Sequence, residues 1–167
     1  MMSYIFRKMH ADDTESIWTL FQGIKAEKID MSFAEISQKE EIQSFVENPS
    51  ELTYVAISKE DPHKVLCLVK GRREMTEEKR HAAFLSAATH PHVRGIGLAV
   101  KLTDFALKEM KNEGVTIARI YVYSNNIASI NAIKKLNFTH AGTVLRHHRD
   151  VSTGEYIDDL IFHKILD

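Results

Sequence analysis

Two glycines behind an arginine form the stretch of this sequence best suited to binding an anion. Arg94-Gly95-Ile96-Gly97 lies where an apolar, strand-like run gives way to a helical pattern. A helix N-terminus presents unpaired backbone N–H groups and the positive end of the helix dipole, and glycine has no Cβ to hold a phosphate away. Two glycines could equally serve only a tight turn. The residue types alone leave both interpretations open.

Two common nucleotide motifs fit this stretch poorly. A P-loop needs Gly-Lys-Ser/Thr at its end, whereas the chain has Gly97-Leu98-Ala99. The dinucleotide fingerprint G-x-G-x-x-G needs a third small residue where the chain has Val100. That fingerprint also belongs near the first strand of a βαβ series, whereas this loop follows the fourth expected strand. The spacing therefore disfavours both an ATP or GTP loop and a Rossmann-type site.

A third pattern fits, and a second segment supports it. Arg94, Gly97 and Ala99 match Arg/Gln-x-x-Gly-x-Gly/Ala. One helix and one strand downstream, the pattern V-x-x-x-N-x-x-A/S-x-x-x-Y-x-K-x-G-F is met without gaps at Val122, Asn126, Ser129, Lys135 and Phe138. In both motifs the chain resembles the GNAT superfamily of acetyl-CoA-dependent N-acetyltransferases. The resemblance extends over nearly the whole chain.

The resemblance implies a site for acetyl-CoA. In the family, backbone amides of the glycine loop hold the CoA pyrophosphate, and an N–H of the splayed fourth strand faces the thioester oxygen. Carried over to matching positions, the cofactor-binding residues are Ala87, Ala88, Thr89, Arg94, Gly95, Ile96, Gly97, Leu98, Ala99, Asn126 and Ser129. Preorganised donors of this kind stabilise the oxyanion that forms as an amine attacks the thioester.

Two positions depart from the family pattern. Asn137 replaces the usual glycine, and asparagine tolerates positive φ better than other non-glycine residues. Ile133 stands where many members have a tyrosine that protonates the leaving thiolate. Three explanations remain open: another acid such as Tyr123, Ser129 or a water, departure of the thiolate unaided, or a poor enzyme.

A general base is also needed, because an amine must lose a proton before it attacks. His81 is the candidate: it lies 13 positions before Arg94, where some members place a catalytic glutamate. A histidine suits base chemistry near neutral pH, although His81 could also be a solvated residue at a strand start. The nine histidines show no spacing typical of three zinc ligands, so no metal is expected. Cys67 lies in an apolar strand and is expected to be an inert core thiol.

Composition narrows the class of protein. A chain of 167 residues is the size of one domain, and a single domain over residues 1–167 is expected. A net charge of −1 gives no sign of a nucleic-acid partner. The sequence has one cysteine, no signal-peptide pattern and no long apolar run, so a cytoplasmic protein without a membrane partner is expected. A homodimer is neither indicated nor excluded.

The residue patterns predict eleven main elements. Strands are expected at 3–9, 52–58, 65–71, 81–89, 116–123, 138–148 and 155–165, and helices at 14–28, 33–47, 97–112 and 127–136. Gly114 is expected to cap the third helix. The order contains hairpins before one βαβ crossover. With the family resemblance, it predicts an α/β fold with a twisted, mostly antiparallel mixed sheet of about seven strands flanked by about four helices.

The expected function is transfer of an acetyl group from acetyl-CoA to a primary amine by direct attack. The acceptor would be a small molecule or the N-terminus of a peptide or protein. The alternative is a non-catalytic acyl-CoA-binding or sensor module on the same fold, which Ile133 motivates. The segment around Lys25 to Phe33 and the last hairpin would shape the acceptor site.

Overall fold

The seven strands form one sheet in a computed structural model that describes residues 3–27 and 36–167. Their order across the sheet is β1-β2-β3-β4-β5-β7-β6. The strands are β1 (Tyr4–Lys8), β2 (Glu51–Ser58), β3 (Val65–Arg72), β4 (Ala82–Thr89), β5 (Ile117–Tyr123), β6 (Thr139–Arg149) and β7 (Tyr156–Ile165). β4 and β5 are parallel, and the other five neighbouring pairs are antiparallel. The expected mixed, mostly antiparallel sheet is confirmed.

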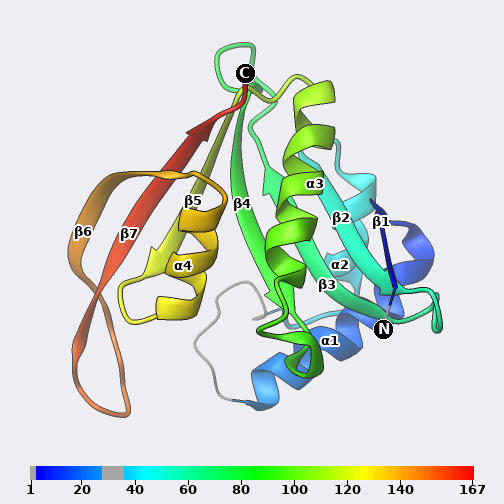
Figure 1. Ribbon diagram of the computed structural model, residues 1–167, viewed down its shortest axis with the longest axis horizontal. Helices are drawn as coiled ribbons and strands as arrows, with labels where there is room; N and C mark the ends of the chain where they lie inside the picture. The colour runs from blue at the N-terminus through cyan, green and yellow to red at the C-terminus, as the bar shows by residue number, and fades with distance from the viewer. Residues whose placement is uncertain (1–2, 28–35) are drawn as a thin grey trace.

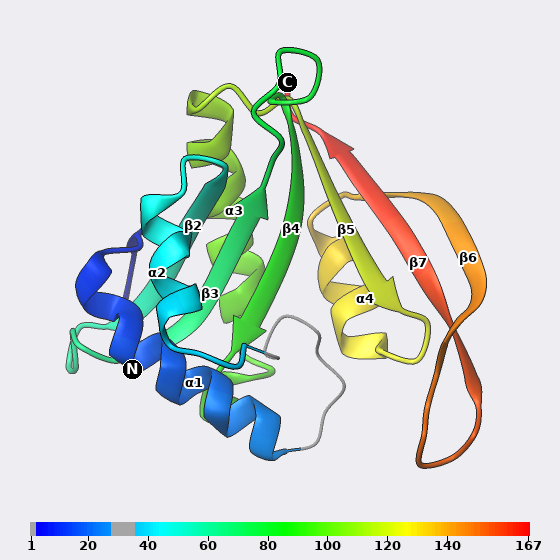
Figure 2. The ribbon, with the colours of Figure 1, turned by 180° about the vertical axis from the view of Figure 1, so that it is seen from behind.

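In the described part of the chain, four helices cover the sheet, two on each face. They are α1 (Thr14–Ala26), α2 (Glu40–Glu47), α3 (Leu98–Asn112) and α4 (Ile127–Lys135). Figure 1 shows α3 and α4 in front of the sheet, and Figure 2 shows α1 and α2 on the opposite face. Two apolar clusters fill the layers: α3 and α4 pack over one, and α1 and α2 over the other.

Alternation along β4 divides its side chains between the two layers. Ala83 and Leu85 belong to the cluster under α3 and α4. Ala88 belongs to the cluster under α1 and α2. Successive side chains of a strand point to opposite faces, so β4 contributes to both apolar layers. A central strand held from both faces is a rigid support for groups at its end.

The second helix is shorter than the sequence indicated. We expected a helix over 33–47, but α2 begins at Glu40; residues 33–35 lie outside the described part of the chain. Glu41 explains the late start, because its carboxylate accepts hydrogen bonds from the Ser37 hydroxyl at 2.9 Å and from the Gln38 N–H at 3.0 Å. These bonds favour a turn before the helix instead of a further helical turn.

Both helices that follow the glycine loop and β5 end in the same way. Gly114 follows α3 with φ of 88°, and Asn137 follows α4 with φ of 62°. In each case the next N–H bonds back five residues, from Val115 to the Met110 carbonyl at 3.0 Å and from Phe138 to the Ile133 carbonyl at 3.3 Å. This is the Schellman arrangement. The expected cap at Gly114 and the expected tolerance of positive φ at Asn137 are confirmed.

No helix in the described ranges is long and apolar enough to cross a membrane.

Candidate active site

The sheet opens between its two parallel strands. β4 and β5 pair from Ala82 opposite Ile117 to Leu85 opposite Ile120, and their pairing stops there. β4 continues beside β3 as far as Thr89, opposite Cys67. Figure 1 shows the two strands diverging toward the end where α3 and α4 begin. The result is a gap in the middle of the sheet.

Backbone groups of β4 line one side of this gap. The His90 N–H donates to the Leu66 carbonyl of β3 at 2.8 Å. Because backbone groups of alternate residues point to opposite edges of a strand, the Ala88 N–H also faces β3. The N–H groups of Ala87 and Thr89 therefore face the gap. Of the three β4 residues proposed from sequence, two present backbone donors to the opening.

The glycine loop lies beside the open end of β4. A short 3₁₀ turn, Pro91–Val93, leads into Gly95 with φ of 78° and Gly97 with φ of 80°. Gly97 is the N-cap of α3, and a Cβ built on either glycine would meet nothing within 4 Å. No acceptor is found in the described chain for the backbone N–H groups from Gly95 to Val100. Open space beside unpaired amides at a helix N-terminus fits a phosphate group.

Arg94 connects this loop to two other elements. Its Nε donates to the Thr89 carbonyl at 3.1 Å, and its two terminal nitrogens donate to the Glu27 carboxylate at 3.0 and 2.9 Å. Glu27 is the C-cap of α1, where a cation also interacts favourably with the helix dipole. The fork-shaped guanidinium therefore holds the end of α1, the end of β4 and the loop together.

The first turn of α4 lies at the same end of the sheet. Asn126 is its N-cap, and the Asn126 Oδ1 accepts from the Ser129 N–H at 3.1 Å. The Asn126 N–H in turn donates to the Tyr123 carbonyl at 2.9 Å, which fixes the turn that leaves β5. Figure 1 shows α3 and α4 both beginning toward the open end of the gap. The two sequence motifs thus lie at the same end of the sheet.

Comparison with known families shows which family the chain belongs to. Residues 14–138 match the sequence profile of the acetyltransferase (GNAT) family. The chain belongs to the GNAT acetyltransferase family. It is therefore an acetyltransferase, with acetyl-CoA as its acetyl donor. The match spans both motifs and the helix and strand between them.

Solved structures give the same fold at low sequence identity. A GNAT acetyltransferase from Streptococcus pneumoniae superposes with a TM-score of 0.86 at 17% identity, covering 98% of this chain and 100% of its own. The Ribosomal-protein-alanine N-acetyltransferase from Brucella melitensis gives 0.81 at 20%, covering 97% and 99%. The protein yncA of Salmonella typhimurium, solved with its cofactor acetyl-CoA, gives 0.83 at 17%, covering 98% and 94%. No curated protein matches the sequence.

Ile133 is a core residue in this GNAT protein. Only 4% of it is exposed, and it belongs to the cluster that contains Leu136 and Phe138. An alkyl side chain at this position cannot protonate a thiolate. Any proton donor for the leaving group must therefore be another residue or water.

Tyr123 lies at the open end of the gap. It is the last residue of β5, and its ring stacks on the ring of His148 with centroids 4.6 Å apart and planes 18° from parallel. Its cross-strand partner is Asp159 of β7. The structure therefore brings Tyr123 close to the glycine loop's end of the sheet and adds polar neighbours from β6 and β7.

His81 lies at the other end of the molecule. It directly precedes β4, and its carbonyl accepts from the Thr116 and Ile117 N–H groups at 2.8 and 3.3 Å. Eight residues separate it from Thr89, which corresponds to about 26 Å at roughly 3.3 Å per residue. The structure does not bring His81 together with the other candidate residues.

Two pairs in this region were missed from the sequence. Glu27 contacts Arg94 across 67 positions, and His147 Nδ1 lies 2.7 Å from Asp159 Oδ2 across 12 positions. In the sequence, His147 and His148 are two of the nine histidines that show no zinc-ligand spacing. Within the described ranges no three His, Cys, Asp or Glu side chains are grouped as a metal site would require. The signal in the sequence that could have indicated the His147–Asp159 pair was two adjacent histidines on an expected strand next to a turn.

The one cysteine is unsuited to chemistry. Cys67 is fully buried on β3, with Sγ 3.4 Å from the Thr89 hydroxyl. Burial raises the pKa of its thiol to about 11, so the thiolate is scarce at neutral pH. The expectation of an inert core thiol agrees with this placement.

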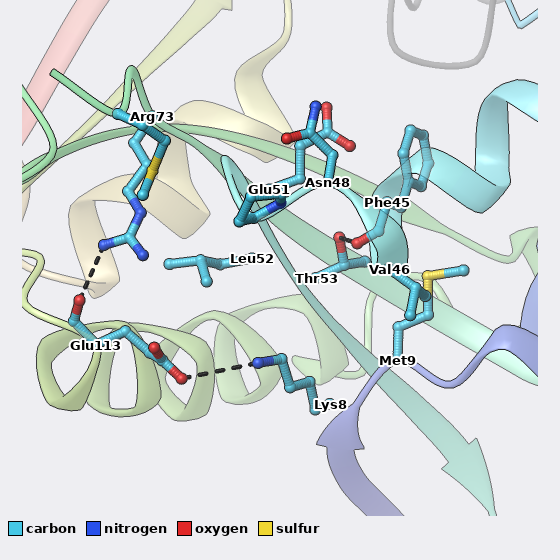
Figure 3. Close-up of a pocket in the computed structure, with 12 residues that line it drawn as sticks. Lys8, Met9, Phe45, Val46, Asn48, Glu51, Leu52, Thr53, Arg73 and Glu113 are labelled. Carbon is cyan, nitrogen blue, oxygen red and sulfur yellow. Dashed lines mark hydrogen bonds and ion pairs between the residues drawn. The ribbon is translucent and has the colours of Figure 1, made fainter.

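A separate cavity of about 220 Å³ lies at the opposite end of the sheet, lined by residues that include Lys8, Glu51, Arg73 and Glu113. Figure 3 shows Arg73 donating to the Glu113 carbonyl, a bond of 2.8 Å, and Lys8 facing the Glu113 carboxylate at 3.7 Å. Glu51 Oε2 and Arg73 Nε are enclosed and have no hydrogen-bond partner, so neither is open to a molecule in the cavity. This cavity contains none of the candidate site residues.

Proposed function

We propose that this GNAT acetyltransferase transfers the acetyl group of acetyl-CoA directly to a primary amine. The observation that carries the proposal is the gap between β4 and β5, because it adjoins a loop of unpaired amides and presents the N–H groups of Ala87 and Thr89. The loop and the first turn of α3 would hold the pyrophosphate, with the first turn of α4 beside them.

The gap supports a single-step attack on the thioester. A thioester placed between the diverging strands could direct its carbonyl oxygen at an N–H of Ala87 or Thr89. Negative charge builds on that oxygen as the amine attacks, so a fixed donor stabilises the transition state more than the ground state. The described part of the chain offers no exposed thiol here that would favour an acetyl-enzyme intermediate.

The leaving group needs less help than an alkoxide would. A thiol has a pKa near 8.5, so a thiolate is a tolerable leaving group at neutral pH. Tyr123, Ser129 or a water could supply the proton that Ile133 cannot. The alternative of a non-catalytic acyl-CoA-binding module, which the buried Ile133 motivates, is disfavoured because the chain belongs to a family of acetyltransferases.

Acetylation of an amine panel tests the proposal. The protein is mixed with acetyl-CoA and with alkylamines, amino acids and short peptides, and both thiol release and product mass are followed. Peptides that begin with alanine belong in the panel, because a structural neighbour is a ribosomal-protein-alanine N-acetyltransferase. We expect an acetylated amine in step with free CoA. Micromolar CoA binding with no acetylated amine from any class would favour the binding module.

A further inference from the structure

A bulge in β6 places two adjacent histidines on one face of the sheet. Val144 pairs with Asp159 of β7 and His148 pairs with Ile157, so three residues of β6 stand opposite the single residue Asp158. At the centre of the bulge, Arg146 has φ of 54°, and its N–H donates to Asp158 Oδ1 at 2.8 Å. Bulges of this kind redirect side chains and are frequent beside active sites.

The bulge changes where His147 points. In a regular strand His147 and His148 would face opposite sides of the sheet. Here the ring of His148 stacks on Tyr123, while His147 Nδ1 lies 2.7 Å from Asp159 Oδ2. Tyr123 and Asp159 are cross-strand partners and share a face. Both histidines therefore meet beside the end of β5.

This cluster lies on the side of the sheet opposite α3 and α4. Val122 and Phe162, the neighbours of Tyr123 and Ile161 along their strands, pack into the cluster under α3 and α4. Alternation places Tyr123 and Asp159 on the other face. Figure 2 shows that α1 and α2 cover β2 and β3 on this face but not β5, β7 or β6. A donor held at the α3 N-terminus approaches the gap from one face, and an acceptor from the other face would meet His147.

The geometry suits proton abstraction. When Nδ1–H donates to the Asp159 carboxylate, the lone pair of the second ring nitrogen, Nε2, is left to accept a proton. The side chain of Asp159 is 13% exposed, whereas that of His147 is 63% exposed. A sheltered carboxylate thus orients a ring whose other edge is open to an incoming molecule. Glu27, the carboxylate at the end of α1, is already bound to Arg94.

We propose that His147, oriented by Asp159, accepts a proton from the ammonium group of the acceptor on the open face of β5 and β7. This inference rests on the proposed amine acetylation. The ammonium gives one proton to His147 Nε2, which passes it to water. The neutral amine bonds to the thioester carbon and the C–S bond breaks. The second proton that nitrogen loses ends on the departing thiolate, so the products are amide, CoA thiol and one released proton.

Acceptors that differ in protonation test the assignment. At pH 7 an alkylamine is almost wholly protonated, whereas hydroxylamine is neutral and needs no base. For His147→Gln we expect kcat/KM with the alkylamine to fall about 100-fold, as the loss of a general base typically costs. With hydroxylamine we expect a change below about threefold, because only abstraction before attack has been removed. Asp159→Asn, which leaves the ring in place, should show the same dependence on acceptor with a smaller loss.

The controls separate this inference from the function on which it rests. His63→Gln, in the exposed loop between β2 and β3, is the matched control and should behave as the wild type. CoA affinity measured by calorimetry must be unchanged in His147→Gln, which verifies folding and the donor site. Equal losses with both acceptors, or no loss with either, would overturn the role of His147 alone. If the wild type acetylates no amine, the proposed function fails and this role fails with it.

Discussion

Gly97 shows how a single residue fixes the chemistry of the donor site. Its φ of 80° is rare for residues with a side chain, and a Cβ there would point into open space beside the α3 amides. The same space is the proposed position of the CoA pyrophosphate. Any side chain at this position competes with the ligand, and an acidic one also repels it.

Gly97→Glu should abolish CoA binding while the protein stays folded. We expect at least a 100-fold rise in Kd, because a carboxylate would occupy the phosphate position and repel the phosphate. Backbone strain at positive φ should lower the free energy of unfolding by about 1 kcal/mol. Isothermal calorimetry measures the affinity. Gly114→Glu is the matched control, since it adds the same charge at φ of 88° at the other end of α3. Unchanged affinity in Gly97→Glu would remove the loop from the site.

Arg94 is a second residue whose role depends on its partners. Its ion pair with Glu27 is about one-third exposed at both side chains, which limits its worth to stability. The carboxylate, however, lies next to a loop proposed to bind an anion. Glu27 therefore partly neutralises the cation that would attract CoA.

Glu27→Gln should tighten CoA binding while slightly destabilising the protein. We expect Kd to fall about threefold, because a negative charge is removed near the pyrophosphate, and stability to fall by at most about 1 kcal/mol. Arg94→Met should raise Kd. Glu15→Gln, at the start of α1 and paired with Lys39, is the control and should leave Kd unchanged. Weaker binding in Glu27→Gln would mean that the carboxylate positions Arg94 for the ligand.

Residues whose role depends on the local backbone could be predicted from the sequence. Short sequence motifs were enough to predict the glycine loop, the N-cap Asn126 and the positive φ of Asn137. Glu27 could not be predicted, because its partner Arg94 lies 67 positions away. Asp159 and its partner His147 are only 12 positions apart. For His147 the distance is short, but the bulge that turns it toward Asp159 leaves no plain mark in the sequence.

At the scale of elements, the helix boundaries that depend on residue type were predictable, whereas the start of α2 was not. α3 and α4 end where Gly114 and Asn137 adopt positive φ, and these residue types favour that conformation. The start of α2 depends instead on the Glu41 carboxylate bonding back to Gln38, which competes with a longer helical pattern. Local competition of this kind decides boundaries that periodicity alone cannot.

Replacement of Asn137 tests its role as a helix cap. Asn137→Gly should raise the free energy of unfolding by about 0.5 kcal/mol, because glycine adopts positive φ without steric cost. Asn137→Ala should lower it by about 1 kcal/mol. Urea titrations measure both values. The Gly114→Ala variant should lose a similar amount at the equivalent cap, and a stabilising Asn137→Ala would contradict the role of φ.

The start of α1 is fixed by a charge pair that responds to acid. Asp13 is 4% exposed; it binds the Arg7 guanidinium at 2.8 and 2.9 Å and accepts the His10 N–H at 2.7 Å. Burial alone would raise the pKa of Asp13, but the hydrogen bonds from Arg7 and His10 outweigh it and hold the pKa below the ordinary aspartate value. This pair joins β1 to the turn before α1.

Asp13→Asn should therefore destabilise the protein in a pH-dependent way. At pH 7 we expect a loss of roughly 2 kcal/mol, less than for a fully buried pair because Arg7 is partly exposed. A lowered carboxyl pKa contributes stability above about pH 4 that is lost as the pH falls through the folded-state value. The difference in free energy of unfolding between wild type and variant, measured by urea titration, should shrink below pH 4. Asp104→Asn removes an exposed ion pair on α3 and should show no such difference.

At the scale of the whole molecule, the element order and sheet type were predicted, but the strand order was not. Periodicity and turns gave seven strands and one βαβ crossover, as found. The placement of β7 between β5 and β6 depends on β7 pairing with both of them, from Ile117 opposite Ile165 to Arg149 opposite Tyr156. Pairing between distant segments is a feature of tertiary structure, and residue spacing along the chain does not predict it.

Ligand binding should stabilise the fold as a unit. CoA at 100 times its Kd adds about 2.7 kcal/mol, and at about 2–4 °C per kcal/mol for a chain of this size Tm should rise by about 5–10 °C. Differential scanning fluorimetry measures the shift. NAD at the same concentration should leave Tm unchanged, since the loop lacks the dinucleotide pattern. An equal shift with NAD would contradict the assignment of the loop to CoA.

The gap in the sheet also sets a limit on how stable this protein can become. Past Leu85 and Ile120 the two central strands do not pair, so each has an unpaired edge within the sheet. The N–H groups of Ala87 and Thr89 therefore lack interstrand hydrogen bonds worth about 1 kcal/mol each. Substitutions that let β4 and β5 close along their full length would strengthen the fold while sealing the passage through it. A stability screen of this chain, run without an activity readout, would therefore select inert proteins.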